Sequence, residues 1–347
     1  MTRRVLIFVF LVILLALPVR AMDFSAPPPP ESAAGYLPKE SDSFGEGLWN
    51  VLSAAMETLY PSLHEGLRGC VRALCAVLAV SIAGQFTKRK TALELAGVAA
   101  VAVILLEPSA ELMELGVETA QELRSYGNLL LPVMASALAA SGGVTASSAL
   151  YVGTAAFDTF LSGAMTRLLE PMIGISVALS IAYAAVGEEL LGRIRELCQW
   201  CMEWALKLTL YLFTGYMTIT GVISGTADAA AGKAAKIAIS GAVPVVGGIL
   251  SDATDAVLLS ASVLGSGAGV WGILTVIAIF CVPAIGIGVR YLLLKLTGAV
   301  ASSLGAGRSA ELIGDFAAAM GLLLALVSTQ AVLLLISAVC FLKGVAR

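Results

Sequence analysis

The chain has 347 residues, of which 59% are hydrophobic and 13% charged, and its formal net charge is −3. Soluble domains carry about 25% charged residues, so the composition excludes an ordinary soluble protein. It predicts an all-α fold, a polytopic bundle of transmembrane helices. A net charge this close to zero gives no indication of nucleic-acid binding. The one histidine, His64, excludes a multi-histidine metal site within the chain, and we expect no cofactor.

The N-terminus has the pattern of a secretory signal. A pair of arginines precedes an apolar stretch, Val5–Leu17, which is too short to span a bilayer. Val19 and Ala21 then supply the small residues that cleavage requires. We predict a signal peptide over residues 1–21, and the alternative is an uncleaved first span.

Residues 22–65 follow as a predicted exported segment. They are acidic, and Lys39 is their one base. The proline run Pro27–Pro30 begins a half that we expect to be disordered. Apolar residues then recur every three or four positions between Phe44 and Leu63, which predicts an amphipathic helix.

Residues 66–347 are predicted to form a multi-pass membrane domain of about seven spans. The first span, Leu67–Phe86, ends at the basic cluster Lys88–Lys90, which the positive-inside rule places in the cytoplasm. A second span, Ala92–Leu106, returns outward to an acidic segment, Glu107–Arg124, which we expect to be an outer loop. The remaining apolar runs of span length are Pro171–Val186, Leu206–Ser224, Val270–Val289 and Phe316–Leu342, with a partly amphipathic linker, Arg290–Arg308, before the last.

Two apolar stretches are interrupted, and the interruptions predict broken or re-entrant helices. One is broken at Ser141–Gly143, and in Gly241–Ser262 a proline and a glycine pair precede Asp252 and Asp255. The i,i+3 spacing puts both carboxylates on one helix face. A charged side chain at bilayer depth costs at least about 2.5 kcal/mol and normally faces protein, water or a partner. Our candidate polar path or gate consists of Ser141, Gly142, Gly143, Pro244, Asp252 and Asp255. The alternative places both aspartates in water just past a membrane edge, with Ser251 or Asp252 capping a helix.

Glu188–Trp204 is predicted to be an amphipathic helix on the cytoplasmic membrane surface, since its apolar and charged residues fall on opposite faces. We take Glu188, Arg193, Arg195 and Trp204 as candidate docking residues for a partner. The simpler interpretation of the charged residues is a solvated helix face.

The same segment holds a lone CxxC motif, Cys198 and Cys201. Such a pair can exchange thiols and disulfides. Both cysteines lie on or beside the apolar stripe, however, where cysteine packs as a small apolar residue, so packing is the favoured role. Gly305–Ser309 resembles a phosphate loop but lacks its lysine and the preceding strand. We therefore expect no catalytic residues, no metal site and no enzymatic activity.

Three blocks of the sequence resemble one known family. Leu130–Val144 (LLPVMASALAASGGV), Ala242–Gly247 (AVPVVG) and Ser251–Val257 (SDATDAV) are similar, in order and spacing, to blocks of the stage III sporulation protein AE family of endospore-forming bacteria. The resemblance covers about residues 67–347, and the N-terminal segment matches in kind only.

This resemblance implies a polytopic protein of the mother-cell membrane around the forespore and membership of a secretion-like channel complex that links the two cells. The implied partners are other stage III sporulation membrane proteins of the same operon, a cytoplasmic secretion-type ATPase, and a forespore membrane protein across the intermembrane space. The resemblance is also compatible with a homo-oligomer. The family has no assigned catalytic residues.

Our hypothesis is therefore a non-enzymatic subunit of that complex, acting as platform or permease. One alternative is a stand-alone secondary transporter, which the broken helices and intramembrane aspartates suggest. The other is a membrane thiol oxidoreductase that uses Cys198 and Cys201.

Overall fold

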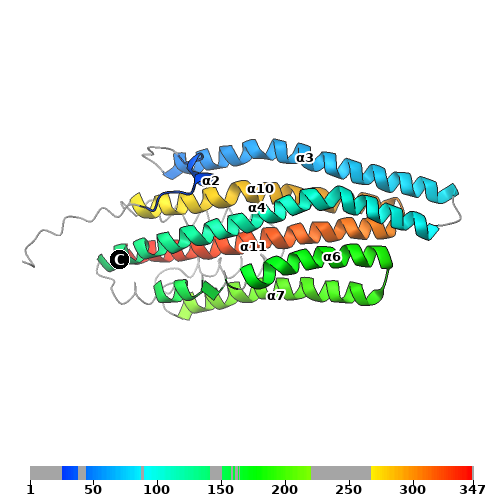
Figure 1. Ribbon diagram of the computed structural model, residues 1–347. Coiled ribbons are helices and arrows are strands. Elements are labelled where there is room, and N and C mark those ends of the chain that lie inside the picture. The colour runs from blue at the N-terminus through cyan, green and yellow to red at the C-terminus, as the bar shows by residue number, and fades with distance from the viewer. Residues whose placement is uncertain are drawn as a thin grey trace, which may run out of the picture.

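Long helices lying side by side make up the described part of the chain (Figure 1). The computed structural model describes residues 26–37, 44–86, 90–140, 151–157, 159–160, 163, 165–219 and 267–345. The principal helices are α2 (Glu31–Ala34), α3 (Phe44–Phe86), α4 (Lys90–Ala140), the π-helical turn η1 (Met165–Leu169), α6 (Glu170–Val186), α7 (Glu189–Ile219), α10 (Gly267–Ser303) and α11 (Gly307–Val345). No strand occurs in these ranges, which confirms the predicted all-α fold.

Five of the described helices are long and apolar enough to cross a membrane, which confirms a polytopic membrane protein. They cover Phe44–Phe86, Thr91–Ala140, Arg167–Val186, Gly269–Ser303 and Gly307–Phe341. All but the third have 35 or more residues. At 1.5 Å per residue such a helix is at least about 50 Å long, whereas the hydrocarbon core of a bilayer is about 30 Å thick. The bundle therefore extends beyond the hydrocarbon core on at least one side.

Several of the described helices are longer than the predicted spans. α4 runs without interruption through Glu107–Arg124, so the outer loop predicted there is wrong. That segment is rich in glutamate, leucine and alanine, which are strong helix formers, and its charge does not end the helix. α10 likewise continues through Arg290 to Ser303, where a linker was expected. α3 joins the predicted amphipathic helix and the first predicted span in one helix.

Two helical hairpins form the core of the bundle. α3 and α4 make the first and α10 and α11 the second, and each helix runs parallel to its counterpart, α3 beside α10 and α4 beside α11. Glycines mark the close contacts: Gly66 of α3 faces Leu293 of α10, and Gly116 of α4 faces Leu323 of α11. Small residues allow such approach. α11 lies at the centre, since it contacts α4, α6, α7 and α10, and it carries no charge over Phe316–Phe341.

A third hairpin, α6 and α7, packs against α11. Gly187 ends α6 in the left-handed region, with φ of 76°, and its N–H donates to the Tyr183 carbonyl oxygen at 2.7 Å. Glycine adopts this conformation without the steric cost that other residues meet. The turn lies at the same end of the bundle as the end of α3 and the α10-to-α11 turn, on the right of Figure 1.

Residues 26–37, which we expected to be disordered, are fixed on the bundle through α2. Ala33 is fully buried, and the Ser32 hydroxyl donates to a carboxylate oxygen of Glu122 on α4 at 2.6 Å. α3 begins at Phe44, where the predicted amphipathic helix begins, and it buries Leu48 and Ala55 of the predicted apolar face. The predicted signal peptide, residues 1–21, lies outside the described residues.

Candidate functional site

The predicted polar path lies outside the residues that the structure describes. All six candidates are affected: Ser141, Gly142, Gly143, Pro244, Asp252 and Asp255. The polar path therefore remains a prediction from the sequence.

The candidate docking helix is the first half of α7, whose outer face is apolar. Large exposed apolar residues recur along it every three or four positions and form what we call the α7 stripe: Leu190, Ile194, Leu197, Trp200, Trp204, Leu208, Tyr211 and Leu212. Trp200 and Trp204 lie one turn apart, with their ring centroids 5.9 Å from each other. A contiguous exposed apolar surface of this kind faces either lipid or another protein.

Two of the candidate docking residues, Glu188 and Arg193, are exposed beside the α7 stripe. Arg193 Nη2 lies 3.9 Å from Glu189 Oε2, and the two side chains are 80% and 89% exposed. An exposed pair at this distance contributes little stability. Both charged side chains are therefore accessible to a partner.

Trp204 is part of the α7 stripe. The remaining candidate, Arg195, points into the bundle and anchors α7 to α11. Its side chain is 8% exposed, and Nη1 donates to Asp315 Oδ2 at 2.6 Å. Nη2 donates to Glu311 Oε1 at 3.2 Å. The guanidinium also lies over the Tyr183 ring of α6, 4.8 Å from the ring centroid. One arginine thus joins α6, α7 and α11, and we call these four residues the Arg195 cluster.

The positive charge of Arg195 is stabilised mainly by the carboxylates of Asp315 and Glu311. Burial alone lowers the pKa of Arg195, but the charges and hydrogen bonds of Asp315 and Glu311 outweigh burial, so its pKa is raised. The guanidinium is therefore always charged. Its Nε atom is buried without a hydrogen-bond partner among the described residues. Loss of a carboxylate would leave a buried charge poorly compensated, which is strongly destabilising.

The solvated position expected for Arg195 is wrong. Residues two apart on a helix are separated by about 200°, so Arg193 and Arg195 cannot share a face. The partners Asp315 and Glu311 were not predicted, because they lie 120 and 116 positions further along the chain. Glu311 and Asp315 lie four positions apart at the start of α11, just before its long uncharged part. This spacing is the signal that could have identified them.

α4 carries an acidic stripe along the segment that was predicted to be a loop. Its members are exposed or partly exposed and lie three or four positions apart: Glu107, Glu111, Glu114, Glu118 and Glu122. Glu114 and Glu118 border a cavity of about 370 Å³ between α4, α6 and α11. Its other lining residues are apolar: Met113, Val117, Ile173, Leu323 and Leu326.

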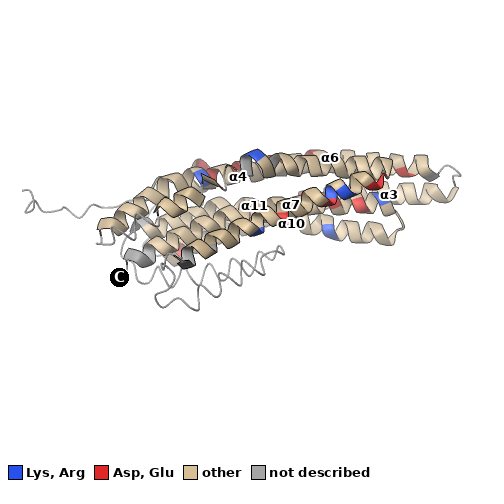
Figure 2. Cartoon of the chain, turned by 90° about the horizontal axis from the view of Figure 1, so that it is seen from below, with Lys and Arg blue, Asp and Glu red and all other residues tan. Residues whose placement is uncertain are grey.

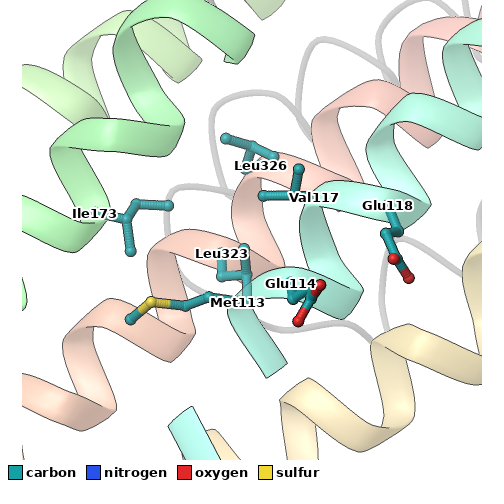
Figure 3. Close-up of a pocket in the computed structure, with 7 residues that line it drawn as sticks. All are labelled: Met113, Glu114, Val117, Glu118, Ile173, Leu323 and Leu326. Carbon is teal, nitrogen blue, oxygen red and sulfur yellow. The ribbon is translucent and has the colours of Figure 1, made fainter. Parts of the chain in front are cut away.

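The cavity joins carboxylates to an apolar wall. In Figure 3, Ile173 of α6 lies opposite the two glutamates, with Leu323 and Leu326 of α11 between them. Its volume is at the small end of the range for ligand pockets. Its lining suits a group that is basic at one end and apolar at the other.

Cys198 and Cys201 are free, partly buried thiols on α7. Their positions fit the packing role that the sequence favours. Across the part of the chain that the structure describes, no group of three or more His, Cys, Asp or Glu side chains is placed to hold a metal ion.

Similarity to known proteins extends over most of the chain. A family model described as stage III sporulation protein AE matches residues 69–344. A curated relative from Bacillus subtilis (strain 168), named stage III sporulation protein AE, is 28% identical over 191 residues. The alignment covers 55% of this chain and 48% of the relative, so the chain spans about half the length of the relative it matches. No solved structure matches the chain.

Proposed function

The chain belongs to the stage III sporulation protein AE family, and on this premise we propose that it is a non-enzymatic membrane subunit of a secretion-like channel complex between mother cell and forespore. The family and the five apolar helices make it a sporulation membrane protein. The finer role, a platform or permease in the mother-cell membrane, is supported by the way α7 is mounted on the bundle.

α7 is a fixed helix whose outer face is left exposed by the other helices that the structure describes, and this observation carries the proposal. The Arg195 cluster ties its inner face to α11, while the α7 stripe is exposed. Exposed charges at Glu188, Arg193, Glu196 and Glu203 flank the first half of the stripe. Charges at this density are costly in hydrocarbon, so that half lies outside the hydrocarbon core, where a protein partner can reach it. A surface held in place before binding loses little entropy when a partner docks.

The partner that we assign to this half of α7 is the cytoplasmic secretion-type ATPase. The α6-to-α7 turn lies at the same end of the bundle as the start of α4, where the basic cluster Lys88–Lys90 favours the cytoplasm. The opposite end, with α2 and the start of α3, then faces the intermembrane space, where the other membrane subunits and the forespore membrane protein are available. Tryptophan is enriched among the residues that dominate interfaces, so Trp200 and Trp204 are the expected anchors.

The test replaces both anchors, Trp200→Ala with Trp204→Ala. We expect the variant to reach the membrane in normal amount, because both rings are exposed. Capture of the ATPase with the variant, and the yield of heat-resistant spores, should each fall at least about tenfold, since an interface anchor contributes roughly 2 kcal/mol or more. The matched control is Ile175→Ala, an exposed apolar residue on α6 outside the α7 stripe. Normal capture by the double variant would refute docking on this face.

The polar path is a separate part of the proposal and is supported by the sequence alone. Replacing Asp252 and Asp255 together by asparagine removes both charges and keeps the side-chain size. We expect spore yield to fall while the amount of protein in the membrane stays constant, because the carboxylates would serve transport rather than folding. A normal spore yield would show that they are polar groups at a membrane edge.

A further inference from the structure

α3 is the outer helix of the first hairpin, and large apolar residues recur along its outward face over nearly its whole length, with the charged residues Glu57, Glu65, Arg68 and Arg72 exposed beside them. It packs on α10 and α4, yet large apolar residues remain exposed along it, including Trp49, Met56, Tyr60, Val71, Ile82 and Phe86. These residues extend over about 55 Å at 1.5 Å per residue, nearly twice the thickness of the hydrocarbon core. Lipid therefore cannot cover the whole face, and the remainder has the character of a protein interface.

Three exposed cations lie beside this apolar face. Arg68 and Arg72 are one turn apart on α3, and Lys295 is exposed on α10. Because Gly66 faces Leu293 and the two helices are parallel, Arg68 is level with Lys295. No ion pair to any of these three cations is found within the described residues.

The acidic stripe of α4 presents the opposite charge. Like charges three and four positions apart on a helix repel one another, and the four glutamates from Glu107 to Glu118 have no ion-pair partner in the described ranges. Glu111, Glu114 and Glu118 lie alongside the uncharged part of α11, since Gly116 faces Leu323. Carboxylates at the depth of an apolar span avoid lipid and turn to protein or water. A positively charged protein surface would satisfy them.

The cations and the carboxylates lie at the same height along the bundle axis. Tyr291 of α10 faces Gly321 of the antiparallel α11, and Leu323 of α11 faces Gly116 of α4. These two contacts fix the register of α10 on α11 and of α11 on α4. In that register, Lys295 is level with the α4 turn between Glu107 and Glu111. Figure 2 shows that the charged residues gather in the middle of the bundle and toward one end.

The two charged surfaces are carried by different helices of one molecule. Glu114 and Glu118 border the cavity against Ile173 of α6, whereas the cations lie on the α3–α10 pair. A neighbouring copy with the same orientation in the membrane therefore meets the glutamates with its cations, and no shift along the membrane normal is required.

We propose that copies of this chain associate side by side, with Arg68, Arg72 and Lys295 of one copy against the acidic stripe of the next. The apolar face of α3 supplies the uncharged part of the contact. Because two different surfaces meet, the contact is heterologous and generates a ring when the rotation between copies closes. This association is independent of any partner on the α7 stripe.

The experiment uses the full-length chain with two different affinity tags, co-produced in one membrane and extracted in detergent. One variant reverses the cations (R68E, R72E and K295E), and the other reverses three carboxylates (E107K, E111K and E114K). Each variant alone brings like charges together, so co-capture of the two tags should fall at least about tenfold. When the two variants are co-produced, complementary surfaces meet again, and co-capture should return. The control is R167E, a charge reversal at an exposed residue of η1 that lies outside both charged surfaces, and it should leave co-capture unchanged.

Three outcomes would overturn the proposal. The first is an unmodified chain that shows no co-capture, and the second is a reversal variant that retains it. The third is a complementary pair that stays apart although each member keeps the unfolding temperature of the unmodified chain. The unfolding measurement separates loss of association from loss of fold.

Discussion

Arg195 orients α7 through one buried charge. Its two nitrogens bind Asp315 and Glu311 of α11, and Tyr183 of α6 covers the guanidinium. Arg193, two positions earlier, is almost fully exposed. Arg195 and Arg193 thus mark two faces of α7: an inner face that is fixed to the bundle and an outer face that is accessible to a partner.

The first prediction concerns the partner of this arginine. Asp315→Ala should lower the free energy of unfolding by about 3–5 kcal/mol, because it leaves the buried guanidinium with the exposed carboxylates of Glu311 and Glu196 as its remaining partners. Arg193→Met should change it by less than about 0.5 kcal/mol, because an exposed pair contributes little. Unfolding in detergent, followed by tryptophan fluorescence, measures both. Equal effects of the two substitutions would contradict an anchoring role for the Arg195 cluster.

At the scale of elements, α4 shows what the sequence could and could not predict. Its helical character and its apolar ends follow from local composition, which a single sequence displays. The expectation of a loop over Glu107–Arg124 came from charge, but charge determines where a segment is solvated and does not set its backbone conformation. The helical propensity of the same residues was the better guide.

α4 also depends on close approach to α11, and this gives a second prediction. A Cβ atom at Gly116 would lie 2.6 Å from Leu323 Cδ1 and 2.7 Å from its Cγ, so the Leu323 side chain or the two helices must shift. Gly116→Ala should therefore cost about 1–3 kcal/mol of unfolding free energy.

Gly314→Ala on α11 is the matched control, since nothing lies within 4 Å of the added Cβ atom. That change should be neutral or slightly stabilising, because alanine favours a helix over glycine. Thermal unfolding of both variants in the same detergent makes the comparison. A Gly116→Ala variant as stable as the control would mean that α4 and α11 are less closely packed than described.

At the scale of the whole molecule, three helix connections share one end of the bundle. The end of α3, the α6-to-α7 turn and the α10-to-α11 turn lie together, and α2 lies at the other end (Figure 1). The sequence predicted the cytoplasmic side for Lys88–Lys90 and for Glu188–Trp204 separately, and their common end agrees with both assignments. The pairing of the two hairpins was not predictable, because it depends on contacts such as Gly66 with Leu293, which no local pattern encodes.

This arrangement predicts the labelling pattern of the intact cell. Single cysteines at Thr91, Glu188 and Ser303, in a background without the six native cysteines, should all be protected from a membrane-impermeant thiol reagent. A cysteine at Ser32, at the opposite end, should react. The three protected positions must respond alike, because the fold places them together. A reactive cysteine at position 188 beside a protected one at position 91 would contradict the bundle, and reversal of the whole pattern would contradict its orientation.

The parallel pairing of the hairpins also has a consequence for biosynthesis. α3 and α4 leave the ribosome first, but α10 and α11, which cover their inner faces, are completed only about 200 residues later. At a translation rate of roughly 5–20 residues per second, the nascent first hairpin waits on the order of 10–40 s for its own partner. During that wait the second hairpin of a chain made nearby can take the vacant place. Hairpin exchange between newly made chains is therefore the characteristic assembly error of this architecture.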